Sequence, residues 1–434
     1  MRPRTVELGL LVLASIITVA AYGLTSLGRA ASLPADIGPF LGIVVALLLL
    51  GHLLVRFFAP QADGLLLPVA ALLNGLGYVM IARLNPDLAD SQSAWTFIGL
   101  MAFGLTLMIL DDPRRLQPYR YSLALAGVIL LLLPLIPGIG VEINGARIWL
   151  HIGPFSIQPG EFAKILLAAF LAGYLVDNRE LLMVSNRRLG PLHLPDFKHF
   201  GPMLLAWGVA LMVMVTQRDL GSSLLFFTLF VVMVYLATSR VAYVLTGFFM
   251  FGLGATVAYR LFDHVQRRVE IWIDPFADAK DRGFQIVEAA FAMADGGLTG
   301  TGLGRGTPGK IPYASTDMIF AAFGEELGLV GATAILILFL FLVTAGFRVA
   351  TQAISPFEQL LAGGLTALLG FQAFVIIGGV LRVLPLTGVT LPFVSYGGSS
   401  LISNYVVLAI LVRISQRTNA MPRTQGVEIE MVPA

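Results

Sequence analysis

The segment that decides the fold runs from Arg267 to Gly328 and reads RRVEIWIDPFADAKDRGFQIVEAAFAMADGGLTGTGLGRGTPGKIPYASTDMIFAAFGEELG. It is the one long stretch rich in charge, glycine and polar side chains in a chain that is otherwise mostly apolar. Long apolar runs precede and follow it, as expected of helices that cross a membrane. If the protein carries out chemistry, this polar segment is where we expect it.

The composition is that of an integral membrane protein. The 434 residues are 57% hydrophobic and only 12% charged, and the mean hydropathy is +0.84, far above that of soluble domains. A span needs about 20 apolar residues, which predicts an all-α polytopic bundle of about twelve transmembrane helices. Allowing errors of a few residues, we place these spans at approximately 7–24, 38–55, 64–82, 93–110, 121–138, 160–176, 201–216, 221–238, 241–259, 318–346, 357–381 and 400–416.

Composition also excludes several kinds of function. A net charge of +2 is too small to indicate a nucleic-acid partner. The chain has no cysteine, so thiol nucleophiles and thiolate metal sites are excluded. Its five histidines lack the paired spacing of a zinc centre.

Basic residues predict the orientation in the membrane. With the N-terminus inside, the inner loops carry more arginine than the short outer loops, as the positive-inside rule requires. Both termini are then cytoplasmic. Four polar segments meet on the extracytoplasmic side, namely 139–159, 217–222, about 260–317 and 382–399.

Within the large outer loop, the spacing of apolar residues predicts a short helix over 284–295. The glycine-rich run that follows offers unpaired backbone N–H groups, which can bind anions weakly. Residues 304–310 match the start of a phosphate-binding loop, but Ile311 stands where Ser or Thr would hold magnesium. No strand precedes the match and Pro308 interrupts it, so we reject a nucleotide-hydrolysing function.

Asp317 is the carboxylate that stands out. It follows Ser315 and Thr316 and opens an apolar run, so it should lie at the outer mouth of a membrane helix. One interpretation is structural, in which Asp317 caps the helix and complements its dipole. The other is a partly desolvated general base with a raised pKa.

Other charged residues also admit two interpretations. Glu325 and Glu326 lie farther along the same helix, where carboxylates are costly and normally face a partner or a cavity. Glu161 and Lys164 are three residues apart, which favours a buried internal pair. Arg218 suits bidentate phosphate binding, or it pairs locally with Asp219.

Six stretches together resemble the SEDS family, named for shape, elongation, division and sporulation. In chain order they are GARIWLHIGPFSIQPGEFAKI (145–165), QRDLGSSLL (217–225), IWIDPFADAKDRGFQ (271–285), GGLTGTGLG (296–304), STDMIFAAFGEELG (315–328) and LPLTGVTLPFVSYGGSSL (384–401). The first of them resembles elongation-type members more than division-type members. The resemblance implies a ten-helix core over 61–417, two additional helices within 1–60 and a cytoplasmic tail at 418–434.

The family resemblance also implies a function. Members are peptidoglycan glycosyltransferases of the bacterial cytoplasmic membrane that polymerise lipid II on the outer side of that membrane, together with a single-span class B penicillin-binding protein. The essential aspartate of the family falls on Asp317, with Met318 in place of a phenylalanine. Ile376 stands where the family often has asparagine, and the role of that position is unassigned.

A sugar hydroxyl that attacks a lipid diphosphate donor needs a base and positive charge for the leaving group. We expect Asp317 to be the base. A divalent cation such as Mg²⁺ or Mn²⁺ would assist, and no organic cofactor is expected. The candidates for substrate binding are Arg218, Arg267, Lys310, Glu161, Lys164, Gln285, Glu325, Ser395, Tyr396 and Ser399. The alternatives are a lipid II transporter and a non-catalytic scaffold for a transpeptidase.

Overall fold

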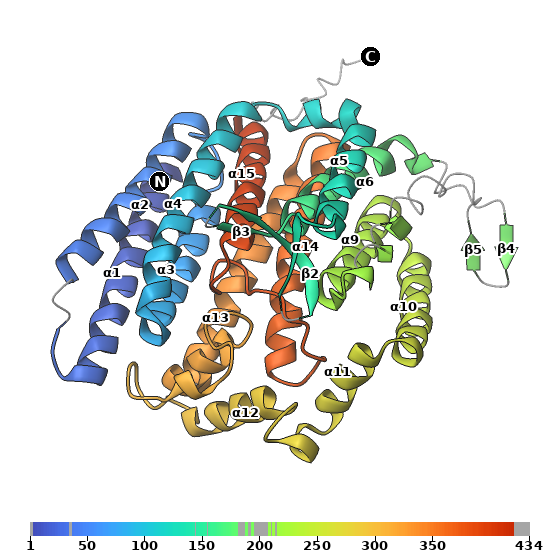
Figure 1. Ribbon diagram of the computed structural model, residues 1–434. Helices are drawn as coiled ribbons and strands as arrows, with labels where there is room; N and C mark the ends of the chain where they lie inside the picture. Colours follow the sequence, from blue (N-terminus) through green and yellow to red (C-terminus); the bar gives the residue numbers. More distant parts are fainter. Residues whose placement is uncertain are drawn as a thin grey trace, which may run out of the picture.

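The computed structural model describes residues 3–33, 37–143, 145–153, 155–180, 187–189, 192–194, 207–209, 211–212 and 215–420. Within these ranges, ten helices are long and apolar enough to cross a membrane. The predicted polytopic helical bundle is therefore confirmed. Figure 1 shows α1 and α2 on one flank, α10 on the opposite flank, and α11 and α12 closing one end.

The long helices follow the apolar runs of the sequence. Their bounds are α1 Pro3–Ala30, α2 Ile37–Phe58, α3 Leu66–Leu84, α4 Pro86–Ile109, α5 Arg120–Leu132, α6 Gly160–Asp177, α9 Leu220–Thr238, α10 Val241–Leu261, α13 Ile319–Gln352, α14 Pro356–Val380 and α15 Gly398–Ala420. Two of the helix starts are visible in the sequence. Asn85 caps α4 before Pro86, and Ser355 forms a capping box with Glu358 at the start of α14.

Two of the twelve predicted spans need comment. Helix α6 lies where the span at 160–176 was predicted. It is not among the ten apolar helices counted above, because it carries three charged side chains, Glu161, Lys164 and Asp177. The span predicted at 201–216 falls largely outside the described residues. Of the tail predicted from residue 418, α15 continues through Ala420, and the rest lies outside the described residues.

Short strands are the main departure from an all-α chain. The predicted outer loop at 139–159 contains an antiparallel sheet of β1 (Gly140–Ile143), β2 (Ala146–Ile152) and β3 (Phe155–Ile157). A second antiparallel pair of strands is formed by β4 (Arg187–Leu189) and β5 (Leu192–Leu194), with Arg188 opposite His193 in the register. These strands have three to seven residues, too few for a clear alternating pattern.

The large polar segment is more ordered than a loop. It holds α11 (Asp263–Ile273), α12 (Phe284–Gly296) and short 3₁₀ turns at Pro275–Asp278 and Pro308–Lys310. The helix predicted over 284–295 is confirmed by α12. Helix α11 was not predicted.

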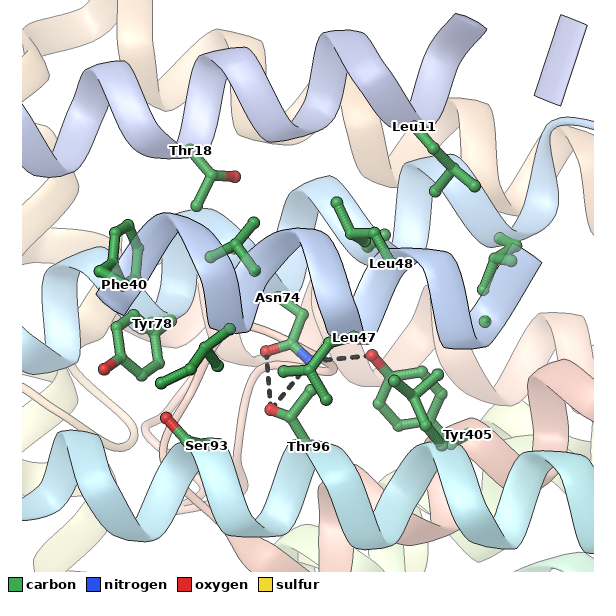
Figure 2. Close-up of a pocket in the computed structure, with 17 residues that line it drawn as sticks. Leu11, Thr18, Phe40, Leu47, Leu48, Asn74, Tyr78, Ser93, Thr96 and Tyr405 are labelled. Atoms are coloured by element: carbon green, nitrogen blue, oxygen red, sulfur yellow. Dashed lines mark hydrogen bonds between the residues drawn. The ribbon is translucent and has the colours of Figure 1, made fainter. Parts of the chain in front are cut away.

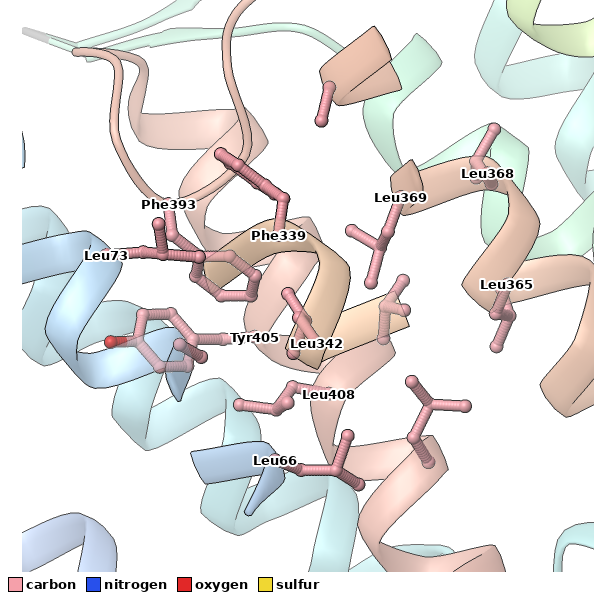
Figure 3. Packing of buried hydrophobic residues seen from close by; sticks show 14 of the residues in the cluster. Leu66, Leu73, Phe339, Leu342, Leu365, Leu368, Leu369, Phe393, Tyr405 and Leu408 are labelled. Atoms are coloured by element: carbon pink, nitrogen blue, oxygen red, sulfur yellow. The ribbon is translucent and has the colours of Figure 1, made fainter. Parts of the chain in front are cut away.

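The core of the bundle lies around α15. Its neighbours include α3, α4, α13 and α14, and Figure 3 shows Leu66, Leu342 and Leu408 from three of these helices meeting there. Small residues allow close helix crossings, as expected in membranes. A Cβ at Gly99 would lie 2.5 Å from the ring of Tyr405, and one at Gly346 would lie 2.4 Å from the Thr366 hydroxyl.

Candidate active site

Asp317 lies in the turn that leads into α13, next to α12, whose Gln285 contacts it. Figure 1 shows α11 and α12 together at one end of the bundle. The first cap position of α13 is Met318, and no side chain caps the helix there. The structural interpretation of Asp317 as a helix cap is therefore wrong. Its carboxylate is half-buried and accepts hydrogen bonds from other side chains instead.

Two side chains donate to this carboxylate. The Thr316 hydroxyl donates to Oδ1 at 2.9 Å, and Gln285 Nε2 of α12 lies 3.4 Å from Oδ2. The second contact is at the long limit of a hydrogen bond. The structure thus brings Gln285, a predicted substrate-binding residue, to the predicted base, while its role toward substrate stays a prediction.

Burial and charge act on Asp317 in opposite directions. Desolvation by burial raises the pKa of its carboxyl, and the contacts with Thr316 and Gln285 and the charge of Arg268 lower it in part. The net effect is a raised pKa, since burial is the largest cause. A carboxylate of this kind accepts a proton more readily than an exposed aspartate.

Arg268 of α11 is the cation that acts on Asp317. Its Nη1 donates to the carbonyl of Leu386 at 3.1 Å and to that of Thr387 at 2.9 Å. Its charge also interacts with Asp219, and burial lowers the pKa of its guanidinium. We named its neighbour Arg267 instead, because without a predicted helix over 263–273 the sequence does not show which of the two arginines faces inward.

Positive charge gathers around His264 at the same end. Burial lowers the pKa of its imidazole, and Arg268, Arg218 and Arg267 lower it further through their charges. Arg218 and Arg267 are exposed, and Arg218 has a left-handed φ of 61°. The charges of two predicted substrate-binding residues, Arg218 and Arg267, therefore both act on His264. Lys310 is exposed in the turn Pro308–Lys310.

Asp219 lies beside this cluster and begins α9. Its carboxylate accepts from the Ser222 backbone N–H at 3.0 Å, so it caps the helix. Burial raises the pKa of Asp219, while Ser222 and Arg268 act against that rise. The sequence motif around 217–225 contained this residue, but we had assigned it only to a pair with Arg218.

Ser395 and Tyr396, two predicted substrate-binding residues in the segment before α15, form hydrogen bonds within the protein. Ser395 Oγ donates to the Thr316 carbonyl and accepts from Leu391 N at 2.9 Å. The Tyr396 N–H donates to the Ser315 carbonyl at 2.8 Å. Ser395 and Tyr396 therefore bind the residues just before Asp317.

Ser399 has a similar protein partner. Its hydroxyl accepts from Gln158 N at 2.9 Å, which joins the start of α15 to the segment before α6. This contact occupies one acceptor position of the Ser399 hydroxyl. Whether Ser395, Tyr396 and Ser399 also bind substrate stays a prediction.

Glu161 and Lys164 form the buried pair that their spacing predicts. Lys164 Nζ lies 2.7 Å from Glu161 Oε2 and donates to Gln372 Oε1 at 3.0 Å. Ser403 Oγ donates to the same Glu161 oxygen at 2.9 Å, and Gln372 Nε2 donates to the Thr390 carbonyl at 2.8 Å. This network ties α6, α14 and α15 to the segment before α15, and a role in substrate binding stays a prediction.

Glu325 and Glu326 are held by the glycine-rich segment. Thr307 N donates to Glu325 Oε1 at 2.6 Å, and Gly304 N donates to Glu326 Oε2 at 3.0 Å. Arg83 Nε of α3 lies 3.2 Å from Glu326 Oε1. These contacts give Glu325, which we had predicted to bind substrate, a structural partner. They also use N–H groups that we had expected to bind an external anion.

The described residues do not group three or more His, Asp or Glu side chains as a metal site would. Magnesium is also bound through one or two carboxylates together with substrate phosphates. Asp317 could supply one such ligand. The described residues therefore offer no ready-made site for the predicted divalent cation, which stays a prediction.

A cavity of about 60 Å³ lies away from Asp317, between α1, α2, α3, α4 and α15. Figure 2 shows Asn74, Thr96 and Tyr405 forming its polar side. Asn74 Nδ2 donates to Tyr405 Oη at 2.9 Å and lies 3.3 Å from Thr96 Oγ1. None of the lining residues belongs to the segment 263–318, so this cavity is separate from the candidate site.

Comparison with known proteins gives consistent results. The chain matches the family model FtsW/RodA/SpoVE, described as "Cell cycle protein", over residues 63–420. It is 46% identical to the peptidoglycan glycosyltransferase RodA of Mycobacterium tuberculosis, over 97% of this chain and 92% of that protein. It is 35% identical to the probable peptidoglycan glycosyltransferase FtsW of Geobacter metallireducens, over 83% of this chain and 96% of that protein.

A solved structure agrees with these matches. That structure is described by the words "Structural coordination of polymerization and crosslinking by a peptidoglycan synthase complex". The likeness has a TM-score of 0.69 and 29% identity, covering 82% of this chain and 98% of the other. The family model alone matches well over half of the sequence. The chain therefore belongs to the FtsW, RodA and SpoVE family, the SEDS family that its motifs resemble.

Proposed function

We propose that this protein is a peptidoglycan glycosyltransferase that polymerises lipid II in cell-wall synthesis, with Asp317 as its general base. The observation that carries the proposal is a half-buried carboxylate of raised pKa, Asp317, whose titration is influenced by the charge of Arg268. Arg268, Arg218 and Arg267 also act together on nearby His264. The names of the relatives support the same reaction. The similarity to a RodA supports a role in elongation and cell shape.

The proposed reaction is a single displacement. The 4-hydroxyl of one sugar attacks the anomeric carbon of the other, and the bond from that carbon to the lipid diphosphate breaks. Asp317 takes the hydroxyl proton, and the undecaprenyl diphosphate leaves with the bonding electrons. An α-linked donor then gives a β-1,4 product with inversion, so one base is enough.

Arg218, Arg267 and Arg268 are suited to the leaving diphosphate. Negative charge develops there in the transition state, and fixed cations stabilise it more than they stabilise the ground state. Arg218 and Arg267 are exposed and can reach a ligand. Arg268 is held by two carbonyls, which fixes its position relative to Asp317.

The distribution of charge supports an extracytoplasmic site. At the end of the bundle opposite α12, Arg4 donates to the Ala62 carbonyl and Arg413 donates to the Phe58 carbonyl. Arg348 pairs with Asp63 at the same end. We propose that this end is cytoplasmic, because it carries the loops in which the positive-inside rule predicts the excess of basic residues.

We propose a single-span class B penicillin-binding protein as the partner. The support is the likeness to a synthase complex that coordinates polymerization and crosslinking. A lipid II transporter would need charged groups free to line a path across the bundle. Here Glu161 pairs with Lys164 and Glu326 with Arg83, which favours the polymerase.

The test is polymerisation of purified, labelled lipid II by the wild type and by Asp317→Asn, each with the partner transpeptidase. We expect long glycan from the wild type alone, with both proteins equally folded. Equal polymer from both would remove Asp317 from the chemistry. No polymer from either, in an assay validated with another polymerase, would favour the transporter or the scaffold.

A further inference from the structure

Helix α1 touches the segment that carries the candidate site. A Cβ at Gly28 would lie 2.0 Å from the carbonyl oxygen of Leu303, and a Cβ at Gly304 would lie 2.1 Å from that of Thr25. Real Cβ atoms do not come so close to backbone oxygen, so any side chain at residue 28 must displace either α1 or residues 303–304. Both α1 and α2 precede residue 63, where the match to the family model begins.

Helix α1 is not free to move aside. Near its middle, Thr18 fits against Gly75 of α3, where a Cβ would lie 2.2 Å from the Thr18 hydroxyl. At its far end, buried Glu7 lies 2.9 Å from His52 Nδ1 of α2. Arg4 also donates to the Ala62 carbonyl. Because α1 is held at Arg4, Glu7 and Thr18, we expect a larger residue at position 28 to displace the glycine-rich segment.

The glycine-rich segment is in turn bonded to α13. The N–H groups of Thr301 and Gly302 donate to the carbonyls of Glu325 and Glu326 at 2.9 and 3.0 Å. Leu329 N donates to the Gly297 carbonyl at 3.0 Å, just past the kink at Gly328, whose φ is 67°. Displacing this segment therefore moves the first turns of α13.

Asp317 lies two residues before the first turn of α13, which begins at Ile319. A Cβ at Gly296 would lie 2.0 Å from the Gly324 carbonyl, so α12, which bears Gln285, is packed tightly on the same turns. The segment 297–307, α12 and the start of α13 thus form one packed unit around Asp317. Leu303 packs beside Ala21, Phe40 and Val79, which joins that unit to α1, α2 and α3.

We propose that α1 is a positioning element of the active site, in which the contact between Gly28 and Leu303 sets the place of the glycine-rich segment and, through it, of Asp317. Catalysis is sensitive to such placement, because a shift of about 1 Å can cost about 100-fold in rate. This role needs no contact between α1 and substrate. The inference rests on the proposed polymerase function.

The first test compares the same substitution at two glycines of α1. Gly28 meets the Leu303 carbonyl, whereas a Cβ at Gly9 meets nothing within 4 Å. We expect Gly28→Ala to lower kcat for lipid II polymerisation about 10- to 100-fold with KM little changed, and Gly9→Ala to behave as the wild type. Equal kcat for the two folded variants would overturn the proposal.

A second pair covers the case in which Gly28→Ala does not fold. Leu303→Ala removes the side chain that packs against α1, while Leu298, in the same segment, is 67% exposed. We expect Leu303→Ala to lower kcat more than Leu298→Ala does. The proposal is wrong if the two leucine variants have the same kcat.

A third measurement does not depend on activity. The chain has no cysteine, so a Lys310→Cys variant carries a single spin label between the glycine-rich segment and Asp317. We expect Gly28→Ala to change the mobility of that label and Gly9→Ala to leave it unchanged. If neither Gly28→Ala nor Gly9→Ala changes the spectrum, the proposed displacement is wrong. If Gly28→Ala changes the spectrum but the wild type does not polymerise lipid II, only the polymerase function is contradicted.

Discussion

Two groups of carboxylates lie within the first turns of α13 and its approach, and the protein holds them differently. Glu325 and Glu326 are buried at 3% and 1% exposure and bind backbone N–H groups and Arg83. Asp317 is only half-buried, and its contact with Gln285 of α12 is long at 3.4 Å.

The difference indicates a structural role for Glu325 and Glu326 and a chemical role for Asp317. A carboxylate whose oxygens already accept strong hydrogen bonds is a poor base, since proton uptake would break those bonds. Asp317 keeps acceptor capacity for a substrate hydroxyl. The following predictions test that contrast.

The largest effect should come from Asp317→Asn. The amide keeps the size of the side chain but cannot take a proton, so polymerisation of lipid II should fall about 10²- to 10⁴-fold. Thermal unfolding in detergent should show a protein at least as stable as the wild type. A loss of activity that follows a loss of stability would instead give Asp317 the same structural role as the glutamates.

Glu326→Gln should affect stability most. It removes the charge that faces Arg83 and leaves that arginine with its hydrogen bond to the Gly306 carbonyl at 2.9 Å. Because one partner of the ion pair is lost, we expect a cost of up to about 3–5 kcal/mol. Denaturant or thermal unfolding measures the loss. Double substitution with Arg83→Gln should recover part of it, and a Glu326→Gln protein of wild-type stability would contradict the assignment.

The pH dependence should sharpen the comparison. Burial raises the pKa of Asp317, and only the ionised carboxylate acts as a base. The rate should therefore fall as the pH drops through a value above the ordinary 3.8 of an aspartate. In Arg268→Gln the fall should begin at higher pH, since the opposing cation is gone; an unmoved acid limb would count against the interaction.

Glu325→Gln should have the smallest effect. The amide oxygen still accepts from Thr307 N, so only the charge of that hydrogen bond is lost, at about 1 kcal/mol. Unfolding measurements should place this variant between the wild type and Glu326→Gln. A larger loss than that of Glu326→Gln would reverse the order we infer from the partners.

Local pattern predicted much of this molecule. Apolar runs predicted the spans, periodicity predicted α12, and spacing of three predicted the pair of Glu161 with Lys164. What could not be predicted depends on distant partners. Arg83 reaches Glu326 across 243 residues, and no local signal points to that pairing.

Two misses within the site have the same origin. The sequence does not distinguish Arg268 from Arg267, because the helix over 263–273 decides that Arg268 is half-buried and Arg267 is exposed. Asp317 was weighed as a cap, because a Thr-Asp pair before an apolar run is typical of one, yet the helix starts two residues later. Tertiary packing decided both.

The pair formed by Glu161 and Lys164 bears on how the chain is made. Its later partners, Gln372 and Ser403, lie 208 residues after Lys164 and 242 after Glu161, so a ribosome synthesises α6 long before either exists. The two charges are three residues apart on one helix, and they can neutralise each other as soon as that helix forms. A helix with two ionised side chains can thus enter the bilayer early, and later helices complete its hydrogen bonds.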